Sequence, residues 1–190
     1  MARELPPDKA AARRMIRAER RQRRATATDD VWRELAAALA AHFDRWLAGR
    51  AAPGTVAIYE SLPTEPPTGA LAETLRAQGI RLLVPELLAD KDLTWRAGPL
   101  GADLGRDAIA QADVVVVPAL AIGRDGTRLG QGGGSYDRVL PRVTPGIPVV
   151  AVVFDGELVT AVPSEPHDRR VDAVLTPSDG VRDVQSALKY

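Results

Sequence analysis

The chain has 190 residues, of which 45% are hydrophobic, 26% are charged and only 4% are aromatic, and its formal net charge at pH 7 is zero. This length favours a single domain with a substantial apolar core. The absence of cysteine excludes disulfides, thiolate nucleophiles and Cys-based zinc sites. No segment has the length and apolarity of a signal peptide or a membrane span, so the sequence predicts a cytoplasmic protein without a membrane partner.

Two helices are predicted in the first quarter of the chain. Residues 9–24 are rich in arginine and contain neither Gly nor Pro, which favours a helix. Thr26–Asp30 then supplies capping residues for a second helix, which Gly49 ends. The apolar residues of this second helix recur at spacings of three and four and so form one buried face: Trp32, Leu35, Leu39, Phe43 and Trp46.

Short apolar segments alternate with helices through the rest of the chain. A helix is expected to start at Thr68 and to end at Gly79, and a shorter one to run from Ser135 to Pro141. The predicted strands are 55–59, 80–84, 93–95, 113–118, 148–154 and 171–176. The alternation predicts an α/β fold, a single three-layer α/β/α domain over residues 1–190 with a mostly parallel sheet.

Charge is unevenly distributed although the total is zero. Residues 1–24 contain nine Lys/Arg and three Asp/Glu, so the rest of the chain is acidic. Seven of the 12 residues in 13–24 are Arg, a pattern that can bind nucleic acid through phosphates. No aromatic residues interleave with those arginines, which argues against that interpretation.

The densest chemical pattern is a glycine-rich segment, residues 121–134, expected to be a loop between a buried strand and a helix. Residues 123–138 hold six glycines, with Arg128 before the cluster and Asp137 after it. Glycine allows backbone N–H groups to approach a ligand closely, and a following helix start favours an anion. Arginine adds charge-assisted hydrogen bonds to phosphoryl oxygens, and a carboxylate beside them suits a bridging Mg²⁺.

A flexible surface loop is the simpler interpretation of glycine alone. The segment also matches neither the P-loop nor the Gly-x-Gly-x-x-Gly fingerprint, since no Gly-Lys-Ser/Thr is present and Ser135 stands where the last glycine would be. The combination of glycines, arginine and aspartate in a strand-to-helix connection nevertheless favours a phosphate site.

Residues 116–138 read Val-Val-Pro-Ala-Leu-Ala-Ile-Gly-Arg-Asp-Gly-Thr-Arg-Leu-Gly-Gln-Gly-Gly-Gly-Ser-Tyr-Asp-Arg. This segment resembles the signature of the 5-formyltetrahydrofolate cyclo-ligases. Three flanking patterns resemble further parts of that family in the correct order, so that the resemblance extends over nearly the whole chain: Lys9-x-x-x-Arg13, Tyr59 followed by Glu65, and Pro163…Pro166-His167-Asp168…Val171-Asp172. The sequence differs from the family's usual pattern at Ile122, Gln131 and Ser135.

The resemblance implies ATP-dependent closure of 5-formyltetrahydrofolate to 5,10-methenyltetrahydrofolate, with Mg²⁺ as cofactor and ADP and phosphate as co-products. It implies catalytic roles for Arg128 and Tyr136, and metal binding by Asp137 and Asp172. It assigns the folate to Tyr59, Glu65, Gly132 and Tyr136. It assigns ATP to Lys9, Arg13, Arg128, Leu129, Gly130, Gln131, Gly132, Gly133, Gly134, Ser135 and Tyr136.

Two alternatives stay open beside this enzyme. One is a nucleic-acid-binding protein that uses the arginine-rich helix, and the other is a nucleotide- or folate-binding module without catalysis on the same fold. The charged residues of the pattern favour catalysis, and we expect a monomer with small-molecule substrates and no nucleic-acid partner. Several residues also have simpler interpretations: Lys9 and Arg13 as a solvated helix face, Asp172 as a turn cap, and His167 as structural.

Overall fold

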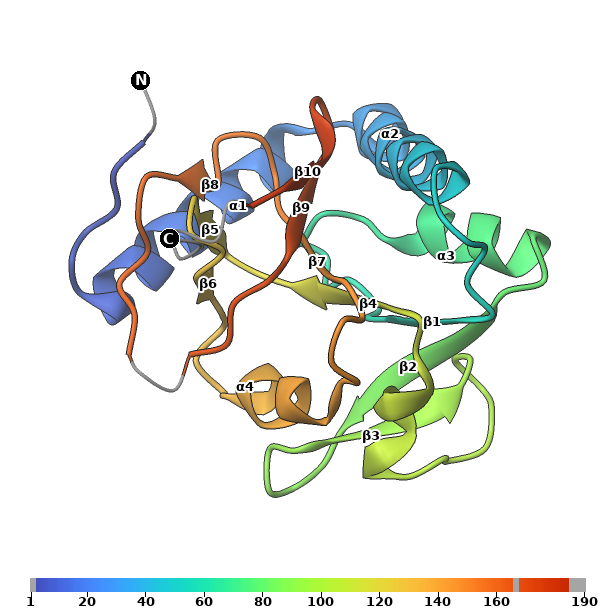
Figure 1. Ribbon diagram of the computed structural model, residues 1–190. Coiled ribbons are helices and arrows are strands. Elements are labelled where there is room, and N and C mark those ends of the chain that lie inside the picture. The colour runs from blue at the N-terminus through green and yellow to red at the C-terminus, as the bar shows by residue number, and fades with distance from the viewer. Residues whose placement is uncertain (1–2, 166–167, 185–190) are drawn as a thin grey trace.

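The fold is built on a seven-stranded sheet, shown in Figure 1 by a computed structural model that describes residues 3–165 and 168–184. The strand order is β10-β9-β7-β4-β1-β2-β3, and the five central strands run parallel to one another. Only β3 and β10, at the two edges, are antiparallel. The strands are β1 (Thr55–Ile58), β2 (Arg81–Leu87), β3 (Leu93–Ala97), β4 (Val114–Pro118), β7 (Val149–Val152), β9 (Ala173–Thr176) and β10 (Gly180–Asp183).

Helices cover both faces of this sheet. Figure 1 shows α2 (Asp29–Ala48) and α3 (Gly69–Ala77) together on one side and α4 (Ser135–Val139) on the other. The 3-10 helices η1 (Arg106–Gln111) and η2 (Leu140–Arg142) lie on the α4 side, where their apolar residues join the same core cluster. Val114–Val117 in β4 are all buried. A strand covered on both faces needs apolar side chains on both, which explains the uninterrupted valine run.

A smaller structure adjoins the main sheet. It consists of a three-stranded sheet, β6-β5-β8, and the first helix, α1 (Lys9–Thr26). One stripe of α1 is buried against that sheet, and Ala12 and Ile16 pack with Leu120, Ala121, Leu129, Val159 and Val162. The strands are β5 (Ala121–Gly123), β6 (Arg128–Leu129) and β8 (Leu158–Val159).

The predicted α/β class and mostly parallel sheet are confirmed, and so are the expected strands of that sheet within one to three residues at each end. Residues 121–134 are not simply a loop, because β5 and β6 form an antiparallel hairpin within them. β8 and β10 also lay outside the predicted strands. Among the described residues, no helix has the length and apolarity required to cross a membrane.

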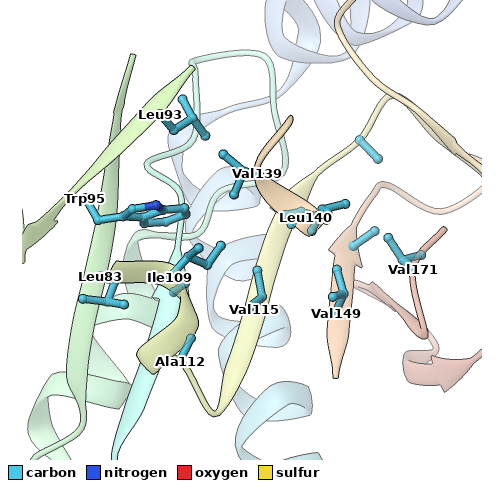
Figure 2. Close-up of a cluster of buried hydrophobic side chains, with 14 of the residues drawn as sticks. Leu83, Leu93, Trp95, Ile109, Ala112, Val115, Val139, Leu140, Val149 and Val171 are labelled. Atoms are coloured by element: carbon cyan, nitrogen blue, oxygen red, sulfur yellow. The ribbon is translucent and has the colours of Figure 1, made fainter. Parts of the chain in front are cut away.

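The core on the α4 side is a continuous apolar cluster that joins the sheet to its covering segments (Figure 2). Trp95 of β3 is 1% exposed and packs with Leu83, Ile109 and Val139 in that cluster. Val139 and Leu140, at the end of α4, bury the segment that follows the glycine-rich hairpin. This packing fixes the position of α4 over the sheet.

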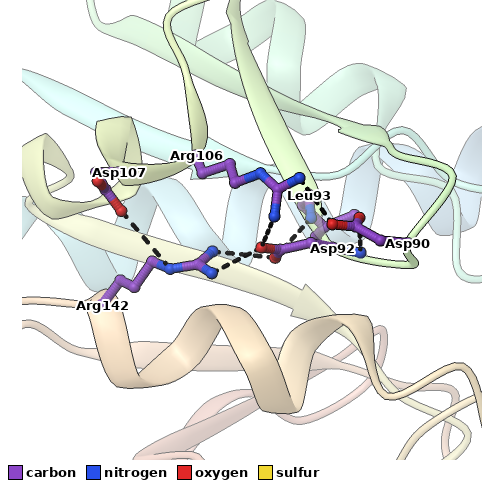
Figure 3. Close-up of polar contacts among 6 residues, drawn as sticks. All are labelled: Asp90, Asp92, Leu93, Arg106, Asp107 and Arg142. Atoms are coloured by element: carbon purple, nitrogen blue, oxygen red, sulfur yellow. Dashed lines mark hydrogen bonds and ion pairs between the residues drawn. The ribbon is translucent and has the colours of Figure 1, made fainter.

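The buried carboxylate of Asp92 links η2, which follows α4, to the β2–β3 turn at the edge of the sheet (Figure 3). Asp92, which is 3% exposed in the β2–β3 turn, accepts two hydrogen bonds from Arg142 of η2 at 3.0 and 2.7 Å. Arg106 donates a third at 3.0 Å and also pairs with Asp90. The hydrogen bonds from Arg142 lower the pKa of Asp92 from 3.8 to about 2, against the opposing effect of burial.

Acid should weaken the fold through this group. Because the pKa of Asp92 is lower in the folded state, its contribution is complete above about pH 5 and is lost as the pH falls from about 4 to 2. We expect Asp92→Asn to reduce the free energy of unfolding by about 2 kcal/mol at pH 7, and the difference from the unsubstituted protein to shrink below pH 4. Urea unfolding at several pH values measures this.

Asp107→Asn is the matched control, because Asp107 faces the same Arg142 at 3.6 Å but its side chain is 91% exposed. An exposed pair of this kind contributes about 0–1 kcal/mol. An equal effect of the two substitutions at every pH would contradict the assignment to Asp92.

Candidate active site

The sheet has a topological switch point between β1 and β4. From β1 the chain first adds β2 and β3 on one side and then β4, β7 and β9 on the other. In open α/β sheets, ligands bind outside the carboxyl ends of the strands at this point. The predicted site residues Tyr59 and Glu65 follow β1, and the glycine-rich hairpin follows β4, so the topology brings these two segments together.

Arg128 is held rigidly at this edge. It stands in β6 opposite Ile122 of β5, and its side chain is 4% exposed. Nη1 donates to the carbonyl of Pro118, the last residue of β4, at 3.3 Å, and Nη2 donates to Oδ1 of Asp137 at 2.8 Å. Its Nε is buried without a hydrogen-bond partner among the described residues. A buried guanidinium with one unused donor is suited to a further anionic partner.

Glycine is required in the segment between Arg128 and α4. Gly132 and Gly134 have φ values of +98° and +71°, which side chains rarely adopt. A Cβ on Gly132 would also lie 3.4 Å from Cζ of Arg13. The glycines therefore allow the arginines of α1 to approach the backbone closely.

Three cations of α1 recur at intervals of four residues, and two of them, Arg13 and Arg17, donate to this segment. Arg13 Nε donates to the carbonyl of Gly130 at 3.0 Å, and Arg17 donates to the side chain and carbonyl of Gln131 at 3.0 and 2.5 Å. Lys9 pairs with Asp168 at 2.7 Å and with Glu165 at 3.3 Å. Arg17 was missing from the predicted set, although its spacing from Lys9 and Arg13 places all three on one helix face.

Tyr59 and Glu65, which were predicted to bind the folate, lie in the segment after β1, across from the glycine-rich segment. Glu65 is 4% exposed and accepts a hydrogen bond from Gln131 Nε2 at 3.1 Å. Tyr59 is 5% exposed, and its hydroxyl has no partner among the described residues. Burial raises the pKa values of Tyr59 and Tyr136 above the ordinary value of 10, so both hydroxyls stay protonated even well above neutral pH.

The structure does not bring the two predicted metal ligands together. Asp137 bonds to Arg128 beside the last residue of β4, whereas Asp172 accepts a hydrogen bond from the N–H of Val149, the first residue of β7, at 2.8 Å. Asp172 therefore lies at the amino ends of the strands and serves as a backbone cap, which corrects its assignment to the metal. No group of three or more His, Asp or Glu side chains in the described part of the chain is arranged to hold a metal.

The remaining predicted positions are also located. Leu129 is buried in the small core, and Ser135 begins α4, a helix of only five residues. Gly133 lies in the same segment, where its carbonyl accepts a hydrogen bond from Arg138. Pro166 and His167 lie outside the described residues.

The fold and the site define a class: an α/β protein whose switch point carries a glycine-rich hairpin flanked by arginines and faced by a buried glutamate. The model of the 5-formyltetrahydrofolate cyclo-ligase family matches residues 9–177. A 5-formyltetrahydrofolate cyclo-ligase of Mycolicibacterium smegmatis is 40% identical over 156 residues, which cover 72% of this chain and 80% of that protein. The chain therefore belongs to the 5-formyltetrahydrofolate cyclo-ligase family and is an enzyme of it.

Other relatives agree with this membership. A 5-formyltetrahydrofolate cyclo-ligase of Escherichia coli K12 is 37% identical over 75 residues, 37% of this chain and 39% of that protein. The 5,10-methenyltetrahydrofolate synthetase of Mycoplasma pneumoniae has the same fold, with a TM-score of 0.71 at 21% identity over 85% of this chain and 96% of that one. The 5,10-methenyltetrahydrofolate synthetase of Aquifex aeolicus also has this fold, with a TM-score of 0.71 at 20% identity over 94% of this chain and 95% of that one.

Proposed function

We propose that the enzyme closes 5-formyltetrahydrofolate to 5,10-methenyltetrahydrofolate at the expense of Mg·ATP, releasing ADP and phosphate. The observation that carries this proposal is the gathering of arginines around the glycine-rich segment at the switch point: Arg13 and Arg17 of α1 donate to Gly130 and Gln131, and Arg128 stands in the same segment. Lys9 lies one turn before Arg13 on the same helix. Such a cluster suits a triphosphate, and Glu65 and Tyr59 face it from the segment that would hold the folate.

The reaction must activate a poor electrophile. The carbon of the N5-formyl group is deactivated by nitrogen, and its oxygen cannot leave as hydroxide. Transfer of the γ-phosphoryl group to that oxygen breaks the bond to ADP and converts the oxygen into a phosphate leaving group. N10 then attacks the carbon, the five-membered ring closes, and phosphate departs with the proton that N10 loses.

The residues of the site suit this task because phosphoryl transfer requires mainly positioning and neutralisation of charge. Arg128 would stabilise the charge that develops on the transferred group, while Lys9 and Arg13 would hold the phosphates. The Tyr136 hydroxyl, kept protonated by burial, would donate a hydrogen bond near the formyl oxygen. Holding N10 beside the activated carbon supplies the entropic advantage of an intramolecular reaction.

Asp137 is the carboxylate that fits Mg²⁺. One of its oxygens bonds to Arg128, and the other accepts no hydrogen bond within the described residues. Mg²⁺ bound with a nucleotide takes one or two carboxylates and otherwise phosphate and water oxygens, so a single free carboxylate oxygen is sufficient. When bound there, Mg²⁺ would neutralise phosphate charge.

The test is direct. The purified protein with 5-formyltetrahydrofolate should produce the absorbance of the methenyl product only when both ATP and Mg²⁺ are present, with ADP formed in equal amount. A parallel assay with an established cyclo-ligase is the control. No product from this protein under conditions in which the control turns over would reject the proposed function.

The nucleic-acid alternative has little support, because several arginines of α1 are used internally. Arg20 is buried, Arg23 lies over Phe154 at 4.2 Å, and Arg24 pairs with Asp29 at 3.3 Å. The monomeric state and the cytoplasmic location stay predictions of the sequence.

A further inference from the structure

We propose that Gln131 is a positioning residue for Glu65 and that Arg17 is its anchor. The three side chains form a chain of hydrogen bonds from α1, through the glycine-rich segment, to the loop after β1. The proposal rests on the proposed function and adds a role on the folate side for a residue of the ATP-binding segment.

Glu65 depends on Gln131 for its orientation. The carboxylate is buried, and none of the ion pairs in the described parts of the chain includes it. Oε2 accepts from the N–H of Leu62 at 3.0 Å, and Oε1 accepts from Gln131 Nε2 at 3.1 Å. Gln131 therefore supplies the side-chain donor to this carboxylate, and a buried charged group depends strongly on each of its donors.

Arg17 determines which way the Gln131 amide faces. A guanidinium only donates hydrogen bonds, so the amide oxygen must face Arg17 Nε, 3.0 Å away, and the amide nitrogen is directed to Glu65. A second bond from Arg17 to the Gln131 carbonyl, at 2.5 Å, fixes the backbone. Arg17 thus acts on Glu65 without touching it.

Gln131→Met tests the first part, because methionine has a similar length but cannot donate. With ATP saturating, we expect the KM for 5-formyltetrahydrofolate to rise about tenfold, the lower end of what a hydrogen bond to a charged group contributes. The kcat at saturating folate should change much less. The melting temperature should fall modestly, because Glu65 stays buried after it loses this donor. Gln131→Asn, which keeps the amide but shortens it, serves as a second variant should Gln131→Met fold poorly.

Arg17→Met tests the anchor. It should raise the KM for the folate by a smaller factor, and the double variant should be no worse than Gln131→Met alone, because both changes remove one chain of bonds. Arg21→Met is the matched control, since Arg21 is an exposed arginine one turn further along α1 and should leave both KM values unchanged.

Three outcomes would overturn the proposal while leaving the proposed function intact. One is an unchanged folate KM in Gln131→Met, and another is a rise confined to the KM for ATP. The third concerns the folate KM of Arg17→Met. An absent effect would show that Arg17 does not anchor Gln131, and an effect that adds fully to that of Gln131→Met would show that the two residues act independently. Failure of the unsubstituted protein to form the methenyl product rejects the proposed function itself.

Discussion

Replacing Arg20 with Ala should lower the free energy of unfolding by about 3–5 kcal/mol, because it removes the closest cation of the buried Glu157 carboxylate and leaves it with the half-exposed Arg23 at 3.7 Å. The side chains of Arg20 and Glu157 are 1% and 2% exposed. Arg20 Nε and Nη2 donate to the two oxygens of Glu157 at 2.9 and 2.7 Å, and Nη2 also donates to the carbonyl of Ala119 at 2.6 Å. The pair joins α1 to the segment between β7 and β8, and the bond to Ala119 joins it to the segment between β4 and β5.

Urea unfolding at pH 7 measures the effect, with Arg21→Ala as the control, because Arg21 is exposed on the same helix. The control should change the free energy of unfolding by no more than about 0.5 kcal/mol. Combining Arg20→Met with Glu157→Leu should recover much of the loss, since no unpaired charge is then buried. A loss below about 1 kcal/mol in Arg20→Ala would show that Glu157 does not depend on this arginine.

Arg128→Met should reduce kcat/KM by about 10²–10³, the usual effect of removing one preorganised donor to a developing charge. Arg128 is buried at the switch point with its Nε free, and it also holds Asp137. The substitution therefore removes a cation from the phosphate site and releases the carboxylate proposed for Mg²⁺. We expect the apparent requirement for Mg²⁺ to rise as well.

The measurement is methenyl formation at saturating ATP and Mg²⁺, together with a Mg²⁺ titration. Arg124→Met is the control, because Arg124 is an exposed arginine in the same hairpin, and it should retain full activity. Near-normal turnover by a well-folded Arg128→Met variant would remove Arg128 from the catalytic set.

The sequence predicted the large sheet because each of its central strands is a local apolar run flanked by turns or helices. It could not predict β5, β6 and β8, which have only two or three residues and are defined by their partners. The strand β5 pairs with β8, and the partners Ile122 and Leu158 are 36 residues apart in the chain. Such contacts leave no periodic pattern in either segment.

The candidate site was predicted in composition but not in its connections. The glycine-rich segment indicated the side proposed for the phosphates, whereas the separation of Asp137 from Asp172 depends on which end of the strands each residue occupies. The partner of Arg20 was also not predictable from composition, because the arginines around it in the run are exposed or only half-buried. Its spacing of four from Ile16, and of eight from Ala12, is the local signal that it belongs to the buried stripe.

The separate core beneath α1 has a consequence for how the molecule opens. Since α1 packs on the small sheet and not on the seven-stranded one, it can detach as its own cooperative unit while the large sheet stays closed to hydrogen exchange. The helix that would hold the nucleotide is therefore anchored by its own core and by the buried pair of Arg20 and Glu157, independently of the large sheet.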